Sequence, residues 1–147
     1  MADIARNRQA SFRYNFLEKW EAGLQLQGSE VKSLRNGGVQ LKDAFATVND
    51  GEVWLHNMHI APYAPASREN HEPERSRKLL LHRGEIERLI GRTSEKGLTL
   101  IPTRLYWKNG RAKVEIALAR GKNVQDKRRY LKEKDARREI QQALQNR

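Results

Sequence analysis

The chain has 147 residues, of which 29 are Lys or Arg and 18 are Asp or Glu, so its formal net charge is +11, and it contains no cysteine. This length fits one domain with a short tail, and the lack of cysteine excludes a disulfide scaffold or a thiolate-bound metal site. No run approaches the ~20 apolar residues that a bilayer span needs, and the first residues lack the apolar core of a signal peptide. We therefore expect a cytoplasmic protein that neither spans a membrane nor is exported.

Alternating apolar residues predict the first strand, over 12–26. Phe12, Tyr14 and Phe16 alternate with polar residues before the phase changes near Leu17. Period two is typical of a half-buried strand, and the change of phase indicates a bulge or a break into two strands.

A short helix is expected over 28–38. Ser29 can cap its first turn, Val31 and Leu34 share a face, and Gly37 can adopt the left-handed conformation that ends a helix.

Two β-hairpins are indicated by turn sequences between apolar runs. Asp-Gly lies between the runs 44–48 and 53–55, and Asn-Gly lies between the runs 98–107 and 112–119. Pro102 cannot donate to a strand ladder, so its strand should be an edge or should be bulged there. In the last strand, the inward-facing residues should be Val114, Ile116 and Leu118.

The segment between the hairpins divides into a loop and a helix. Residues 62–77 hold three prolines and many charges, which favours a mobile loop. Residues 79–90 carry Ile86 and Leu89 on one face, which predicts an amphipathic helix that Gly91 ends.

Antiparallel strands joined by short helices must each hide one apolar face, and a closed barrel does so without exposed edges. We therefore expect a mainly β fold over residues 1–119, an oligonucleotide-binding-like barrel with two or three flanking helices; a β-sandwich is the alternative.

Residues 120–147 form a basic tail with 10 Lys or Arg and 4 Asp or Glu, a net +6. We expect it to be disordered when free and partly helical against a polyanion; a docked C-terminal helix is the alternative.

The histidines and the motifs predict neither a metal site nor an enzyme. His56 and His59 are three apart, which places them on opposite faces of a strand, and His71 and His82 lack the spacing of zinc ligands. No phosphate-binding glycine loop, nucleophile elbow or zinc-protease motif is present. We expect no cofactor; a hydrolase or nuclease assembled from distant residues is the alternative.

The charge points to nucleic acid instead, with a solvated surface or an acidic protein partner as the alternatives. Basic residues neutralise phosphates, and aromatic rings such as Phe12 and Tyr14 stack on unpaired bases, although at period two such rings are more often core. Structured RNA fits better than duplex DNA, because no predicted helix resembles a DNA reader. The basic candidates are Arg6, Arg8, Arg13, Lys32, Arg35 and, entering the second helix, Arg75, Arg77 and Lys78.

Four runs resemble one known family. They are Glu-Ala-Gly-Leu-Gln-Leu-Gln-Gly at 21–28, Glu-Val-Lys-Ser-Leu-Arg at 30–35, Arg-Lys-Leu-Leu-Leu at 77–81 and Leu-Tyr-Trp-Lys-Asn-Gly at 105–110. Together with Gly121-Lys122 and Asp126-Lys127-Arg128, they resemble the SsrA-binding protein family, also called small protein B.

This resemblance implies a non-enzymatic, monomeric RNA-binding protein. Members bind the tRNA-like domain of transfer-messenger RNA (tmRNA) and bring it to 70S ribosomes that have stalled without a stop codon. Elongation factor Tu and alanyl-tRNA synthetase are indirect partners through tmRNA. A structural RNA-binding or ribosomal protein is the alternative function.

The resemblance also implies which residues contact RNA. Asn7, Glu21 and Leu80 match positions that matter for RNA binding in the family. Glu21 either accepts hydrogen bonds from RNA or orients an arginine, and Leu80 is expected to pack under a helix. The full expected set is Asn7, Arg8, Arg13, Glu21, Lys32, Arg35, Lys78, Leu80 and Lys122.

For the tail, the resemblance implies entry into the empty mRNA channel past the 16S rRNA decoding centre. Many relatives carry a ring just before Asp-Lys-Arg, where this chain has Gln125, so the resemblance does not carry stacking over to this position; hydrogen bonding from the Gln125 amide is the alternative. The expected ribosome contacts are Gln125, Asp126, Lys127, Arg128, Lys132, Lys134, Arg137, Arg138 and Ile140.

Overall fold

The structure is a computed structural model that describes residues 2–63, 70–95 and 97–122. The expected ribosome contacts of the tail lie outside the described residues. In chain order, the elements are β1 (Ala2–Arg6), α1 (Ala10–Arg13), β2 (Tyr14–Leu24), α2 (Gly28–Arg35), β3 (Val39–Gln40), β4 (Phe45–Asn49), β5 (Glu52–His56), β6 (His59–Ile60), β7 (Arg77–Leu80), α3 (Arg83–Thr93), β8 (Leu98–Lys108) and β9 (Arg111–Gly121).

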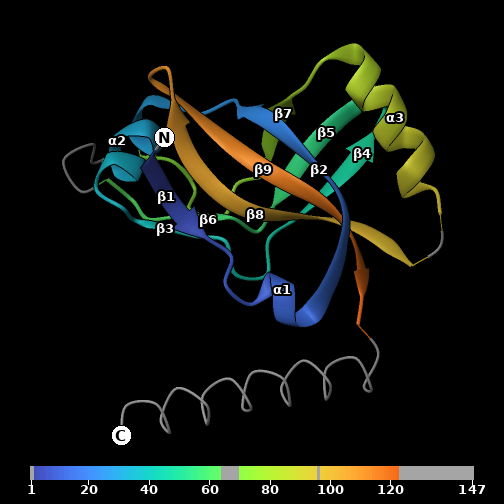
Figure 1. The fold of residues 1–147 in the computed structure, drawn as a ribbon. Coiled ribbons are helices and arrows are strands. Elements are labelled where there is room, and N and C mark those ends of the chain that lie inside the picture. The colour runs from blue at the N-terminus through green and yellow to red at the C-terminus, as the bar shows by residue number, and fades with distance from the viewer. Residues whose placement is uncertain (1, 64–69, 96, 123–147) are drawn as a thin grey trace, which may run out of the picture.

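Most of the described strands form an antiparallel barrel, as predicted, and β3 and β6 pair with each other in a separate two-stranded sheet. Strands β8, β4, β5, β7, β2 and β9 follow one another in the sheet, and pairing between β8 and β9 closes the ring (Figure 1). β1 extends the ring along the part of β8 that β4 leaves unpaired, because β1 pairs with residues 104–107 and β4 pairs with Leu100. The closed ring excludes the β-sandwich alternative.

Both predicted hairpins are present, and their turns explain why. Asp50 and Gly51 have φ of 51° and 75°, and Asn109 and Gly110 have φ of 52° and 75°. Positive φ at both central turn residues matches the right-handed twist of the strands, and Asp-Gly or Asn-Gly adopts it most readily.

Two irregularities predicted from the sequence are also confirmed. The register of β2 against β9 shifts between Phe16 and Glu18, where the apolar phase changes. The register of β8 against β9 shifts between Pro102 and Arg104, so the Pro102 strand is bulged rather than an edge.

The barrel interior is apolar and tightly closed. Val114, Ile116 and Leu118 are fully buried, as expected from their alternation. They pack in one cluster with residues from every strand of the ring, including Trp20, Val53, Leu55, Leu79, Leu100 and Leu105. Because this core fills the barrel, RNA can only be bound on its outside.

Two expected element assignments are wrong. Phe12 lies in α1 rather than in the first strand, which begins at Tyr14. The segment expected as one helix over 79–90 is two elements, because β7 pairs with β5 and β2 before α3 begins at Arg83. α3 also passes through Gly91 to Thr93, so that glycine does not end it. Strand pairing on both sides of β7 overrides the helical spacing.

The cap of α2 also differs from the prediction. Gln27 rather than Ser29 is the N-cap, and it exchanges hydrogen bonds with Glu30 in a capping box. Ser29 instead bonds the Nδ1 of buried His71 at 2.9 Å. Gly37 has φ of 75° just after the helix, as its predicted role requires.

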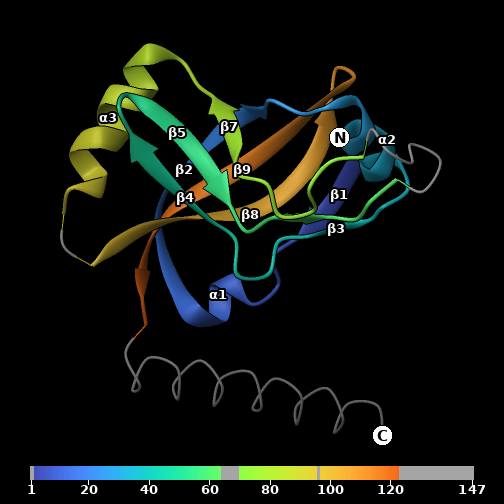
Figure 2. The same cartoon turned by 180° about the vertical axis from the view of Figure 1, so that it is seen from behind.

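The helices lie outside the barrel at three separate places. α2 lies beside β6, α3 lies beside β4 and β8, and α1 lies beside β2, at the opposite end from the β8–β9 turn (Figures 1 and 2). None of the described helices is long and apolar enough to cross a bilayer. The expected loop at 62–77 is described in part, and it ends earlier than expected because Arg77 already belongs to β7.

Candidate nucleic-acid interface

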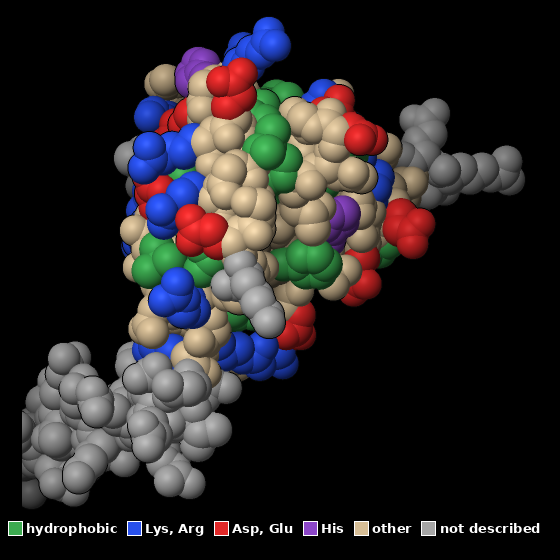
Figure 3. Space-filling view, turned by 90° about the vertical axis from the view of Figure 1, so that its right-hand side faces the viewer, with side chains coloured by type: hydrophobic (Ala, Val, Ile, Leu, Met, Phe, Trp, Pro, Cys, Tyr) green, Lys and Arg blue, Asp and Glu red, His purple; other side chains and the backbone are tan. Residues whose placement is uncertain are grey.

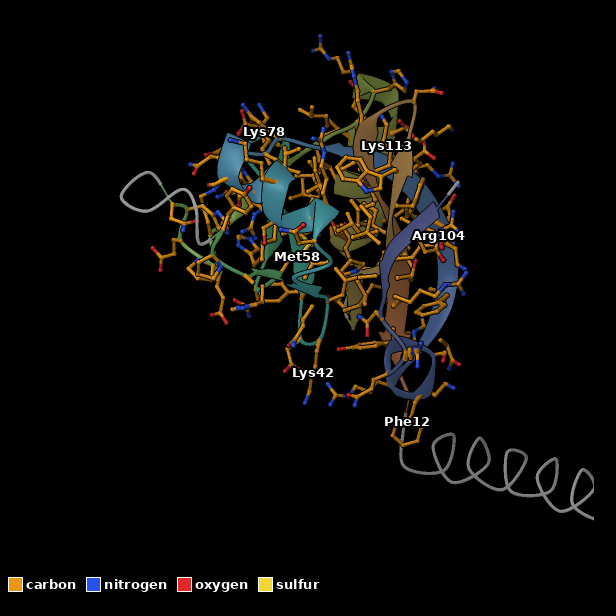
Figure 4. The ribbon with its side chains drawn as sticks, turned by 90° about the vertical axis from the view of Figure 1, so that its left-hand side faces the viewer. Phe12, Lys42, Met58, Lys78, Arg104 and Lys113 are labelled. Carbon is orange, nitrogen blue, oxygen red and sulfur yellow. The ribbon has the colours of Figure 1, made fainter. Side chains whose placement is uncertain are left out.

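The expected RNA contacts lie at two different ends of the barrel. The side chains of Lys78 and Lys113 lie at one end, and Phe12 and Lys42 lie at the other (Figure 4). We call the first the Glu21 end; it is formed by Glu21, Leu80, Trp107, Lys108, Arg111 and Lys113. We call the second the α1 end; it is formed by Asn7, Arg13, Lys42 and Lys122.

Glu21 projects outward from β2 and is fixed by two donors from β8. The Tyr106 hydroxyl donates to Oε2, and the Lys108 ammonium lies 3.2 Å from Oε1 and 3.3 Å from Oε2. The hydrogen bond from Tyr106, together with Lys108 and Lys113, holds the pKa of Glu21 below its ordinary value. The alternative in which Glu21 orients an arginine is wrong, because Tyr106 and Lys108 are its partners.

Leu80 is exposed to solvent and does not pack under a helix, as had been expected. Its relative exposure is 52%, and it borders a groove of about 440 Å³ whose walls include Trp107 and Val31. Gly23 lets Leu80 lie close to β2, because a Cβ at position 23 would lie only 3.3 Å from the Cβ of Leu80. An exposed leucine beside an apolar groove is a surface that a base or ribose can cover.

Arg111 and Lys113 complete the Glu21 end, and the sequence reasoning did not select them. Both line the apolar groove, and Lys113 also borders a hollow that holds Glu21 and Leu80. Neither forms an ion pair within the described part of the chain. Their outward positions on β9 were a signal that could have identified them, because alternate residues of that strand face solvent.

The cations of α2, the helix that also carries Val31, are accessible to solvent. Lys32 and Arg35 are exposed, and the Lys32 ammonium lies 5.8 Å from the centre of the Tyr63 ring. The positive charge of Lys78 is partly neutralised, because its ammonium lies 3.2 Å from a Glu52 carboxylate oxygen. Lys32 and Arg35 are therefore better placed than Lys78 to neutralise phosphate.

The sequence predicted that Arg75 and Arg77 are free cations available to RNA, but both bond an internal carboxylate instead. Arg77 and Glu30 are both fully buried and paired, and Arg75 donates to the same carboxylate at 2.6 Å. Burial alone would raise the pKa of Glu30, but hydrogen bonds from Arg75, Gln27 and Arg77 hold it below its ordinary value. This network joins α2 to β7 and so fixes the wall of the groove.

At the α1 end, two expected contacts have structural partners. The Asn7 amide donates to the Pro102 carbonyl at 3.0 Å, beside the bulge. The Lys122 ammonium donates to the Ser11 carbonyl at 2.7 Å, and the Lys122 N–H donates to the Arg13 carbonyl at 2.8 Å. These bonds fix the direction in which the chain leaves β9.

The remaining cations at this end surround a polar cavity of about 230 Å³. Arg13 and Lys42 line it, and Arg13 is paired with Asp43 at 3.1 Å. Arg8 is exposed nearby in the sequence. This end is basic, and the half-buried side chain of Phe12 also lies there (Figure 4).

The face that carries α3 has mixed charge. Lys and Arg side chains alternate with Asp and Glu there, around a few hydrophobic ones (Figure 3). The Arg88 guanidinium, for example, lies 2.6 Å from the Glu18 carboxylate. Such pairing leaves less free charge for phosphate than at the Glu21 end.

The histidines have partners other than metal. His56 bonds the Thr47 and Ser76 hydroxyls at 2.8 Å each, and His71 bonds Ser29 and the Ile60 carbonyl. Within the described ranges, no three His, Asp or Glu side chains form a group that could hold a metal ion.

Comparisons with known proteins show which family this chain resembles. The family described as SmpB protein matches residues 4–146. The SsrA-binding protein of Geobacillus thermodenitrificans is 58% identical, over 98% of this chain and 93% of the relative, and that of Carboxydothermus hydrogenoformans is 56% identical, over 96% and 95%. A solved chain described as "tmRNA-SmpB: a journey to the center of the bacterial ribosome" is 49% identical and superposes with a TM-score of 0.70, covering 84% of this chain and 87% of that one.

Proposed function

Because the chain belongs to the SmpB protein family, we propose that it binds the tRNA-like domain of tmRNA through the Glu21 end and delivers this RNA to stalled ribosomes. The observation that carries the proposal is the combination found at this end: an exposed Leu80 beside an apolar groove, a fixed carboxylate, and cations that form no ion pair among the described residues. Folded RNA offers unstacked bases, donor groups and phosphates, which match these three features.

The proposed role of the tail is to sense an empty mRNA channel. The expected tail began at 120, but β9 runs to Gly121, so the part beyond the barrel is 123–147. It follows Lys122, which is bonded to α1, so this part starts at the α1 end, opposite the end proposed to hold RNA. Gln125, Asp126, Lys127 and Arg128 would meet the decoding centre of 16S rRNA. The residues that would follow the channel are Lys132, Lys134, Arg137, Arg138 and Ile140.

In this proposal, the protein acts as a cytoplasmic, monomeric adaptor and catalyses no reaction itself. Elongation factor Tu and alanyl-tRNA synthetase are then partners only through the RNA. A permanent ribosomal component is the competing function, and it predicts equal recovery with all ribosomes rather than enrichment on stalled ones.

Deletion of 123–147 tests the division of labour. The cut follows Lys122, so that β9 and its bonds to α1 are retained. The shortened chain should bind the tRNA-like domain with nearly unchanged affinity but should not support tagging of stalled products. Loss of RNA binding on deletion would show that the barrel is not the RNA-binding unit.

The matched variant is Glu21→Gln in the full-length chain. It should lose RNA affinity while its tail is intact. Tagging should then recover when the concentration of the variant is raised, whereas the shortened chain should not recover at any concentration.

A further inference from the structure

Tyr106 lies between the barrel and the carboxylate of Glu21. It belongs to β8, Glu21 belongs to β2, and β9 runs between these two strands, with Tyr106 opposite Lys113 and Glu21 opposite Glu115. The side chain of Tyr106 is buried, with a relative exposure of 2%, and its hydroxyl reaches across β9 to Glu21 Oε2. RNA therefore cannot contact most of Tyr106 directly.

The ring of Tyr106 is fixed as firmly as its hydroxyl. The Arg104 guanidinium stacks 4.4 Å from the ring centre, and Arg104 is itself paired with Asp3 and Glu115. Burial and the neighbouring Glu21 raise the pKa of Tyr106 to about 12, so its hydroxyl keeps its proton and remains a donor. A donor held in this way determines the orientation of its acceptor.

Glu21 keeps unused acceptor capacity in this arrangement. A carboxylate offers about four lone-pair sites. The Tyr106 hydroxyl occupies one, and the Lys108 ammonium approaches both oxygens from one side. With 38% of its side chain exposed, Glu21 can accept further hydrogen bonds from outside.

We propose that Tyr106 is a positioning residue for RNA recognition, which holds the Glu21 carboxylate so that it accepts a hydrogen bond from an amino group or a 2′-hydroxyl of bound RNA. The inference rests on the proposed function. It explains why a basic surface holds the Glu21 carboxylate in a fixed orientation. The cations attract the phosphates of RNA. The free lone pairs of Glu21, in contrast, accept only from a hydrogen-bond donor of the RNA. Binding then depends on more than charge.

The groups that face Glu21 come from every element packed around it. Lys19 lies two residues before it on β2, and β8 contributes Arg104, Tyr106 and Lys108. The neighbouring strand β9 contributes Lys113 and Glu115, and the hollow beside Glu21 is also lined by His82 and Glu85. Because these other ionisable groups lie around Glu21, the test compares variants at each pH rather than relying on one profile.

The test is RNA affinity against pH for Tyr106→Phe in the full-length chain, with a transcript of the tRNA-like domain as the probe. Removing the hydroxyl removes the hydrogen bond that most favours ionised Glu21, so its pKa should rise. The affinity of Tyr106→Phe should therefore begin to fall at a higher pH than that of the wild type. At neutral pH we expect a loss of about 3- to 10-fold, the effect of one hydrogen bond.

Two further variants separate positioning from a general effect on folding. In a Glu21→Gln background, Tyr106→Phe should cause no additional loss, because the acceptor that it positions is already altered. Glu87→Gln changes an exposed carboxylate of α3 that is paired with Arg83 rather than with Tyr106 or Glu21, and the acid limb of its affinity should stay where the wild type has it. A thermal unfolding scan of each variant confirms that it is folded.

The inference is overturned if Tyr106→Phe lowers the affinity by the same factor at every pH, if its effect adds fully to that of Glu21→Gln, or if it has no effect. Failure of the proposed function looks different: the wild type itself would not bind the transcript.

Discussion

The buried ion pair between Glu30 and Arg77 supports the strongest prediction about stability. Both side chains are completely buried, and Glu30 also accepts hydrogen bonds from Arg75 at 2.6 Å and from the Gln27 N–H at 2.8 Å. Glu30→Gln preserves the shape but leaves the Arg77 charge uncompensated. Removing one partner of a buried pair costs about 3–5 kcal/mol.

The structure favours the lower end of that range. Arg77 also donates to the carbonyls of Met58 at 2.6 Å and Pro73 at 3.1 Å, and these bonds survive the substitution. We therefore expect a loss of about 3 kcal/mol, a large part of the ~5–15 kcal/mol by which a domain is stable. Urea unfolding followed by tryptophan fluorescence measures it, provided that the slope with denaturant is unchanged.

Glu52→Gln is the matched control. It breaks the pair between Glu52 and Lys78, whose side chains are 44% and 35% exposed, so it should cost less than about 1 kcal/mol. If Glu30→Gln were no more destabilising than this control, the conclusion that the buried ion pair holds α2 against β7 would be refuted.

The pH dependence of stability gives the same pair a second test. The pKa of Glu30 is lowered in the folded chain from an ordinary value of 4.5, so its contribution is complete above that value. The contribution is lost as the pH falls through the lowered pKa, because folded Glu30 then takes up a proton. The stability difference between the wild type and Glu30→Gln should shrink in that acidic range.

Three further predictions concern the two ends of the barrel. Leu80→Ala should lower RNA affinity several-fold in a filter-binding assay but change the free energy of unfolding by less than about 1 kcal/mol, because Leu80 is half exposed. Asn7→Ala should lower the free energy of unfolding by about 1–3 kcal/mol in urea, because it leaves the buried Pro102 carbonyl without its donor; an unchanged stability would restore Asn7 as a direct contact. Lys113→Met should reduce the slope of log affinity against log salt concentration by roughly 0.7–0.9, the effect of one phosphate contact, and an unchanged slope would show that Lys113 meets no phosphate.

Much of the barrel was predictable because local chemistry and tertiary structure agree there. Asn109-Gly110 requires positive φ at both residues, and the hairpin that it closes has the predicted inward face. Residues 79 and 80 show where such agreement fails. They were predicted to open the helix over 79–90, but they pair with β5 and β2 as part of β7, and a pairing partner distant in the sequence cannot be read from the segment itself.

The site was predictable in its residue types but not in its geometry. The family resemblance implied Glu21 and Leu80, yet only the fold shows that Tyr106 and Lys108 hold the carboxylate and that Leu80 is exposed. Composition also suggested Arg77 as an RNA contact, although it is buried against Glu30. A charge count does not distinguish a cation that faces solvent from one that is paired inside.

Sequencing the RNA that co-purifies with the full-length chain from its native cells tests the central claim most directly. If the Glu21 end holds folded tmRNA, that RNA should be strongly enriched with the wild type and depleted with Glu21→Gln. Recovery of ribosomal RNA alone, in equal amounts with both proteins, would contradict the account.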